Sequence, residues 1–252
     1  MTEKENNNIP LIHNYCDRWC ERCNFTSRCA VYEKSNPASE ADMDDEGFWN
    51  DIGNSLADAL TMLTEKAEEM GIDLNSITEE EIADNAETME AERREAEKHP
   101  LIIAAISYSD HAHELMKKYE VVKDKGMQMI NELELGIKTL EESKSELAEM
   151  KDCHAIVGWY MHQIQIKLQR AMSSARYAED DSPDSMYDAN GSAKVALIGA
   201  ERSLEAWQKL MTMIPATEDE TITLLALLQK IISLTEQEFP GARAFKRPGF
   251  DD

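Results

Sequence analysis

Hydrophobic residues recur at helical spacing along most of the chain, and four segments after Pro100 carry the strongest pattern. In the first, 101–119, the apolar residues fall within one arc when each position is advanced by about 100° around a helix axis. The others run from about residue 151 to 178, from about 191 to 214, and from 217 onward. No alternating run long enough for a sheet occurs. We therefore predict an all-α protein with a four-helix-bundle-like body.

Two helices with weaker patterns are predicted before the bundle. The first spans 46–70 and ends at Gly71, and we expect its apolar face to pack against another element. The second begins after Thr78, where Thr78 and Glu81 form a capping-box signal, and its thin apolar face predicts an exposed helix. The apolar face of the first consists of Phe48, Trp49, Ile52, Leu56, Leu60 and Leu63.

The segments between these helices complete the predicted organisation. A polar amphipathic stretch, 127–150, precedes the second bundle helix, and Ser-Pro-Asp and Asn-Gly predict a loop over 179–190. Thr217 and Glu220 predict a cap for the last helix, while Pro240 and Gly241 end it. We divide the chain into a Cys-rich metal-binding segment (1–34), an acidic linker with acidic helices (35–99), a helical bundle (100–239) and an aromatic and basic tail packed on the bundle (240–252).

The negative net charge of the chain disfavours some classes of binding partner. Twenty-six basic residues stand against fifty acidic ones, for a formal net charge of -24. This charge opposes binding to nucleic acid and to anionic membrane surfaces, which reward clustered Lys and Arg. Residues 35–99 hold twenty acidic and four basic side chains, so we expect this stretch to engage a basic protein partner if it engages any. Residues 1–10 have no apolar signal-peptide core, and we expect a cytoplasmic protein.

Four of the five cysteines lie close together in the motif YCDRWCERCNFTSRC. Cys16, Cys20, Cys23 and Cys29 fall within fourteen positions, and the first three would share one face if the segment were a helix. Thiolates repel one another unless a cation or a cluster takes up their charge. In a reducing compartment, clustered cysteines serve more often as metal ligands or redox centres than as disulfides.

Three interpretations of this motif follow from its spacing. A compact run of cysteines is typical of iron-sulfur clusters, and a [4Fe-4S] cluster is our first prediction, with Arg18, Arg22 and Arg28 offsetting its negative charge. Structural zinc is the alternative, although it more often uses two knuckles separated by a longer loop. The third interpretation is that the cysteines are free or disulfide-linked. The expected ligands of either metal centre are Cys16, Cys20, Cys23 and Cys29.

Catalytic patterns give weaker signals. The triplet Cys16-x3-Cys20-x2-Cys23 resembles that of radical S-adenosylmethionine enzymes, but the resemblance covers only those three residues, and a helical chain lacks that family's alternating strands. No Glu-x-x-His pair supports a ferritin-like di-metal oxidase in the bundle, and the common hydrolase and nucleotide-binding signatures are absent.

We expect a metal-binding protein with a structural, electron-transfer or sensing role. A non-catalytic acidic scaffold is the second hypothesis and the di-metal oxidase the third.

Overall fold

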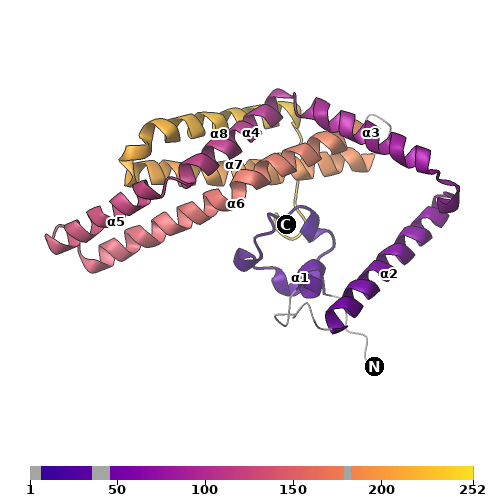
Figure 1. The fold of residues 1–252 in the computed structure, drawn as a ribbon, viewed down its shortest axis with the longest axis horizontal. Helices are drawn as coiled ribbons and strands as arrows, with labels where there is room; N and C mark the ends of the chain where they lie inside the picture. The colour runs from indigo at the N-terminus through magenta and orange to yellow at the C-terminus, as the bar shows by residue number, and fades with distance from the viewer. Residues whose placement is uncertain (1–6, 36–45, 179–182, 252) are drawn as a thin grey trace. The chain divides into compact units, whose positions relative to one another are not determined.

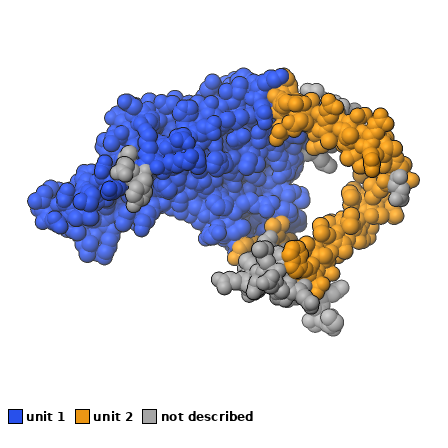
Figure 2. All heavy atoms as spheres, in the orientation of Figure 1, with its two compact units in different colours: residues 1–29, 96–252 blue, residues 30–95 orange. Residues whose placement is uncertain are grey.

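A computed structural model describes residues 7–35, 46–178 and 183–251 of the chain. The chain forms two compact units, the first comprising residues 1–29 with 96–252 and the second residues 30–95 (Figure 2). Every regular element in the described residues is a helix, and none of them is a strand. The predicted all-α class is therefore confirmed.

Four helices of the first unit form its body: α4 (Pro100–Met116), α6 (Leu140–Ala178), α7 (Pro183–Met213) and α8 (Glu218–Glu238). Contacts join α4 to α6, α6 to α7, α7 to α8 and α8 back to α4, so the helices close a cycle around one core (Figure 1). The periodic apolar positions predict this packing because each helix buries one stripe. The largest fully buried side chains of the bundle are Tyr108, Tyr160, Leu101, Ile102, Ile164, Leu168, Leu197, Leu224, Leu228, Ile231 and Val157.

The polar stretch before the second bundle helix is divided between two elements. Helix α5 (Tyr119–Glu134) ends at a turn in which Gly136 has a φ of 69°, and α6 begins directly after Thr139. Thr139 and Glu142 form a capping box, with the Thr139 N–H donating to Glu142 Oε2 at 2.8 Å. The sequence analysis does not identify this capping box. Its predicted start, at about residue 151, is therefore about ten residues too late.

Helix α7 also begins earlier than predicted. It starts at Pro183, which suits the first turn of a helix, and continues through Asn190 and Gly191. A side chain at Gly191 would put its Cβ 2.4 Å from Cε1 of Tyr15, so the glycine makes room for a ring from the N-terminal segment. The expected loop over 183–190 is therefore wrong, and residues 179–182 lie outside the described part of the chain.

The start of α8 corrects a second detail. Thr217 occupies the position before the helix, as predicted, but its side chain makes no cap hydrogen bond. Its hydroxyl instead donates to the carbonyl of Ile214 at 2.9 Å, within the short 3-10 helix η5 (Pro215–Thr217). The preceding turn therefore uses the hydroxyl that the sequence pattern assigned to a capping box.

The second unit contains α1 (Ala30–Ser35), α2 (Glu46–Glu69), η4 (Leu74–Ser76) and most of α3 (Glu79–Ala96). The predicted end of α2 is confirmed, because Gly71 has a φ of 69° and the Ile72 N–H donates to the Ala67 carbonyl at 2.8 Å. The capping box before α3 is also confirmed, with the Thr78 N–H donating to Glu81 Oε2 at 2.8 Å.

The apolar face of α2 does not show the packing expected from its pattern. Trp49, Leu56 and Leu60 are 59%, 61% and 64% exposed, and the side chain of Phe48 lies outside the described residues. The thin apolar face of α3 offers little apolar surface that could cover the apolar face of α2. Most of the expected linker, 36–45, is likewise not described. None of the helices in the described residues combines the length and apolar content needed to cross a membrane.

Close packing of α6 against α7 depends on Gly199. A Cβ at this position would lie 2.9 Å from Cδ1 of Tyr160 and 3.2 Å from Cγ1 of Ile164, both buried. Gly199→Ala is therefore expected to lower the free energy of unfolding by about 1–2 kcal/mol, since overpacking outweighs the gain in helix propensity. Gly126→Ala in α5, where a Cβ meets nothing within 4 Å, should instead raise it by about 0.5–1 kcal/mol. Urea unfolding of both variants measures the contrast, and equal effects would contradict it.

Candidate metal centre

The segment that carries the four cysteines consists of short turns. Three 3-10 helices span it: η1 (Ile12–Asn14), η2 (Cys20–Arg22) and η3 (Thr26–Arg28). Arg18 has a φ of 58°, in the left-handed region that non-glycine residues rarely adopt, so no α-helix connects Cys16 to Cys20. Cys16, Cys20 and Cys23 were expected to share one face only if the segment were a helix, and it is not one.

The turns themselves place two of the cysteines. Cys23 follows η2 and its N–H donates to the Cys20 carbonyl at 3.1 Å, while Cys29 follows η3 and donates to the Thr26 carbonyl at 3.3 Å. The Cys23 sulfur accepts a hydrogen bond from the N–H of Phe25 at 3.4 Å. The turns therefore fix the backbone at Cys23 and Cys29, and the Phe25 N–H orients the Cys23 sulfur.

Cys20 lies within electrostatic range of the other three cysteines. Burial raises the pKa of its thiol, and the sulfurs of Cys16, Cys23 and Cys29 raise it further. All four thiols are free and partly exposed. Among the described residues, no group of three or more His, Cys, Asp or Glu side chains has the geometry to hold a metal ion. The structure thus brings the four cysteines into one neighbourhood, but their sulfurs do not close around a point.

Lys167 of α6 places a buried cation within electrostatic range of Cys16. Only 9% of the residue is exposed, and its Nζ donates to the Asn14 carbonyl at 3.4 Å. Burial and the nearby Arg170 guanidinium lower the pKa of this amine, whereas Cys16 and the Asp188 carboxylate raise it. No carboxylate forms an ion pair with Lys167 within the described residues. A buried ammonium without a direct ion pair is costly, and negative charge at Cys16 would reduce that cost.

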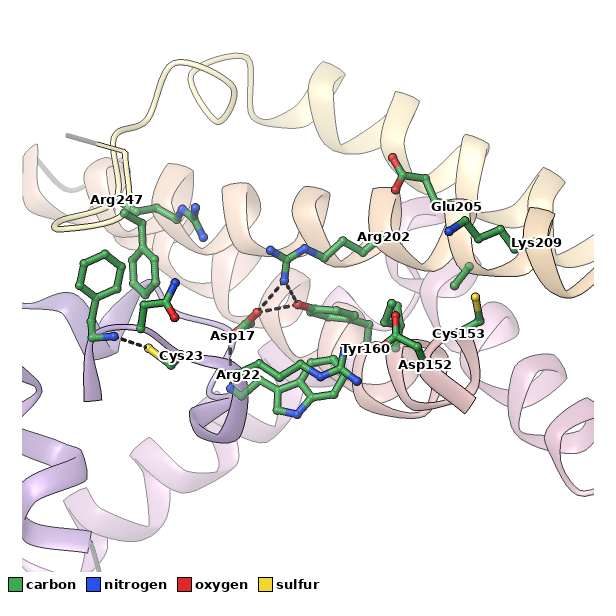
Figure 3. A pocket seen from close by; sticks show the side chains of 16 residues that line it. Asp17, Arg22, Cys23, Asp152, Cys153, Tyr160, Arg202, Glu205, Lys209 and Arg247 are labelled. Atoms are coloured by element: carbon green, nitrogen blue, oxygen red, sulfur yellow. Dashed lines mark hydrogen bonds and ion pairs between the residues drawn. The ribbon is translucent and has the colours of Figure 1, made fainter. Parts of the chain in front are cut away.

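Asp17, next to Cys16, attaches the segment to α6 and α7. Its carboxylate accepts hydrogen bonds from the Tyr160 hydroxyl at 2.5 Å and from Nη1 of Arg202 at 3.0 Å (Figure 3). Its carbonyl accepts from Nε1 of Trp159 at 2.9 Å and from the side-chain amide of Gln163. Four donors from two helices therefore converge on the residue beside the first cysteine.

Aromatic contacts hold the segment on both sides of Asp17. Trp19 stacks on Trp159 with ring centroids 5.0 Å apart, and the Arg22 guanidinium lies 3.9 Å from the Trp19 ring centroid. Trp19 therefore anchors the segment on α6.

Two further ring pairs join the segment to the C-terminal tail. Tyr15 packs edge-on against Phe245 at 4.8 Å, and Phe25 packs edge-on against Phe250 at 5.0 Å. Both tail phenylalanines therefore contact the segment, and Phe245 is buried. The cysteine segment is consequently fixed at several points to the bundle and to the tail.

No protein-family model, curated protein or solved structure matches this chain. The site is therefore interpreted from its own residues. Sequence reasoning found the four cysteines but missed Asp17, Tyr160, Lys167 and Arg202. A signal for Lys167 was present, because it falls inside the apolar arc of its helix, at a position where a lysine is rarely buried without a partner.

Proposed function

We propose that the chain is a metal-binding helical-bundle protein whose centre is held by the thiolates of Cys16, Cys20, Cys23 and Cys29. An iron-sulfur cluster, with [4Fe-4S] first, is the preferred centre, and zinc is the alternative. The observation that carries this proposal is the buried Lys167, which forms no direct ion pair with a carboxylate within the described residues and lies within electrostatic range of both Cys16 and Asp188. Four thiolates around a metal centre would add negative charge close to this buried cation.

The donor set agrees with this assignment. Four free thiols in one neighbourhood provide soft ligands for iron-sulfur clusters or zinc. The four sulfurs do not form a metal-binding group as the described residues are placed, so the proposal requires the cysteine side chains to rotate toward one centre. The compact spacing favours a cluster over a two-knuckle zinc site.

A structural role follows from the position of the segment. The rings of Tyr15 and Phe25, on either side of the cysteines, contact Phe245 and Phe250 of the tail. A centre that cross-links Cys16 to Cys29 would hold both ring pairs at fixed separation and so bind the tail to the bundle. Partial exposure of all four cysteines also gives solvent or a redox partner access to the centre, as electron transfer or sensing would require.

Composition analysis of the intact protein tests this proposal. The full chain is purified without oxygen, and its iron, zinc and acid-labile sulfide are measured together with its visible absorption. Iron and sulfide in equal amounts with a broad visible band are expected for the cluster, and zinc without sulfide for the alternative. A folded protein that contains none of these elements would overturn the proposal.

Lys167→Met tests the electrostatic part of the proposal. The change keeps an unbranched side chain of similar length but removes the charge that would offset an anionic centre. We expect metal release to a chelator about tenfold faster than in the wild type, which corresponds to about 1.4 kcal/mol. Lys144→Met, on an exposed side chain of the same helix paired with Glu141, is the matched control and should change nothing. An unchanged release rate in Lys167→Met would contradict an anionic centre beside Cys16.

We propose as a second candidate that the acidic stretch 35–99 engages a basic protein partner. This candidate is supported by α3, whose first turn carries Glu79, Glu80 and Glu81, all exposed, and by the exposed apolar face of α2. Co-purification from the native host separates the candidates. A stoichiometric basic partner retained after replacement of all four clustered cysteines by serine would favour the scaffold, whereas a partner lost with the metal would not.

A further inference from the structure

An apolar pocket opens at one end of the helical bundle, in the first unit. Its walls come from the last turn of α4, from α6, from the C-terminal part of α7 and from the turn between α7 and α8, and its volume is about 370 Å³. Ligand pockets of helical bundles lie between helices in this way and have volumes in this range. The described lining residues include none of the four clustered cysteines, so the pocket is separate from the proposed metal centre.

Apolar side chains form most of the pocket wall. The indole ring of Trp207 is buried, and its Nε1 donates to the Tyr108 hydroxyl at 3.2 Å, so the one polar atom of this ring is satisfied inside the bundle. Two methionines, Met116 and Met150, add unbranched side chains that can adjust to the shape of a ligand. The apolar lining residues are Leu115, Met116, Met150, Val157, Trp207, Leu210 and Ile214.

The charged groups at the pocket are all basic, although the whole chain has about twice as many acidic as basic residues. No Asp or Glu occurs among the described lining residues, which include Lys118, Lys151 and His154. These three residues are exposed, so they stand at the mouth of the pocket, above the buried apolar wall. The pocket therefore combines an apolar interior with a basic mouth.

Lys151 differs from the neighbouring lysines in having no carboxylate partner in the described part of the chain. Lys118 pairs with Glu220 at 2.6 Å, and Lys144 of α6 pairs with Glu141 at 3.0 Å. Ion-pair partners on one helix stand three or four positions apart, and none of the residues at those distances from Lys151 is acidic. The ammonium group of Lys151 is therefore available to an anionic group at the mouth.

We propose that this pocket binds an aliphatic carboxylic acid, with the carboxylate on Lys151 and the chain along the apolar wall. The carboxylate and the ammonium form a charge-assisted hydrogen bond, and burial of the chain supplies most of the affinity. A neutral apolar molecule would leave Lys151 without a partner, and a polar metabolite would leave the apolar wall unmatched. The site goes beyond the metal-binding function and requires no metal.

Calorimetry of the full-length protein with aliphatic acids tests the ligand class. Octanoate, decanoate and dodecanoate are titrated separately, below the concentrations at which they form micelles, and 1-octanol serves as an uncharged probe. The formal charge of -24 disfavours non-specific adsorption of these anions. We expect saturable binding with a Kd on the order of 100 μM for decanoate. The Kd should fall about fourfold for each added methylene.

Lys151→Gln tests the contact at the mouth. This variant should raise the Kd of decanoate about tenfold and leave the Kd of 1-octanol unchanged, because only the charged ligand uses the ammonium group. Lys144→Gln is the matched control, since Lys144 is an exposed lysine of the same helix that does not line the pocket. Neither Kd should change in the control variant.

Met116→Trp tests the location of the chain. Met116 is partly buried in the wall, so a larger side chain there should fill the pocket and abolish binding of both decanoate and 1-octanol. Met127→Trp is the control, because Met127 is 54% exposed on α5 and does not line the pocket. The helical circular dichroism signal, measured on both variants, shows that each is folded.

Specific outcomes would overturn the pocket assignment. Absence of saturable binding for all three acids would do so, as would unchanged decanoate binding in a folded Met116→Trp protein. Equal effects of Lys151→Gln and Lys144→Gln on decanoate would overturn the contact with Lys151. Replacement of all four clustered cysteines by serine should leave decanoate binding intact, so this result and the result for the metal centre can be told apart.

Discussion

Replacement of Cys20 by serine is expected to remove the bound metal from this protein. The thiol of Cys20 lies within electrostatic range of the other three cysteines. Serine keeps the size of the side chain but is a far weaker ligand for iron or zinc than a thiolate. Metal and sulfide content, measured after purification without oxygen, should fall to background while the helical circular dichroism signal is kept.

Cys153 supplies the matched control for that substitution. It is buried in the bundle core and separated in sequence from the other four, and burial raises the pKa of its thiol. Cys153→Ala should lower the free energy of unfolding by about 1 kcal/mol through loss of packing, with metal content unchanged. Equal metal content in the Cys20→Ser and wild-type proteins would exclude Cys20 as a ligand, and loss of metal in Cys153→Ala alone would move the centre elsewhere.

Asp17→Ala is expected to cause the largest loss of stability among changes outside the core. The substitution leaves the Tyr160 hydroxyl and the Arg202 guanidinium without their shared acceptor, close to a fully buried ring. Loss of a charged acceptor with two donors should lower the free energy of unfolding by about 2–4 kcal/mol. The Asp17 carbonyl still accepts from Trp159, so the segment should loosen without detaching completely.

Trypsin cleavage and chemical unfolding measure this effect together. Cleavage after Arg18, Arg22 and Arg28 should become faster in Asp17→Ala, because these bonds lie in the loosened segment. Asp152→Ala is the control, since the Arg22–Asp152 pair is about half exposed and should contribute less than about 1 kcal/mol. If the two variants lose the same stability, Asp17 does not have the anchoring role that its contacts indicate.

The sequence predicted the elements whose signals are local. The end of α2 at Gly71 and the capping box of Thr78 and Glu81 depend on neighbouring residues alone, and both are present. The start of α7 could not be found in this way. Gly191 looks like a helix breaker in sequence, but Tyr15, 176 positions away, fills the space beside it. A tertiary contact therefore overrides the local preference of Asn190 and Gly191.

The same difference between local and long-range signals applies to the candidate site. Clustering of cysteines is visible in sequence, whereas the partners that surround them come from distant helices. Asp17 is one acidic residue among fifty until Tyr160 and Arg202 are seen to share its carboxylate. Lys167 could have been found, because its helical position falls among apolar residues, but its relation to Cys16 needs the packed structure.

X-ray absorption at the metal edge of the intact protein tests the central claim most directly, because it reports which atoms surround the metal. The proposal predicts sulfur ligands only, at about 2.3 Å, with further iron neighbours if the centre is a cluster. Nitrogen or oxygen ligands in place of sulfur, or a spectrum unchanged when Cys20 is replaced by serine, would contradict a centre held by Cys16, Cys20, Cys23 and Cys29.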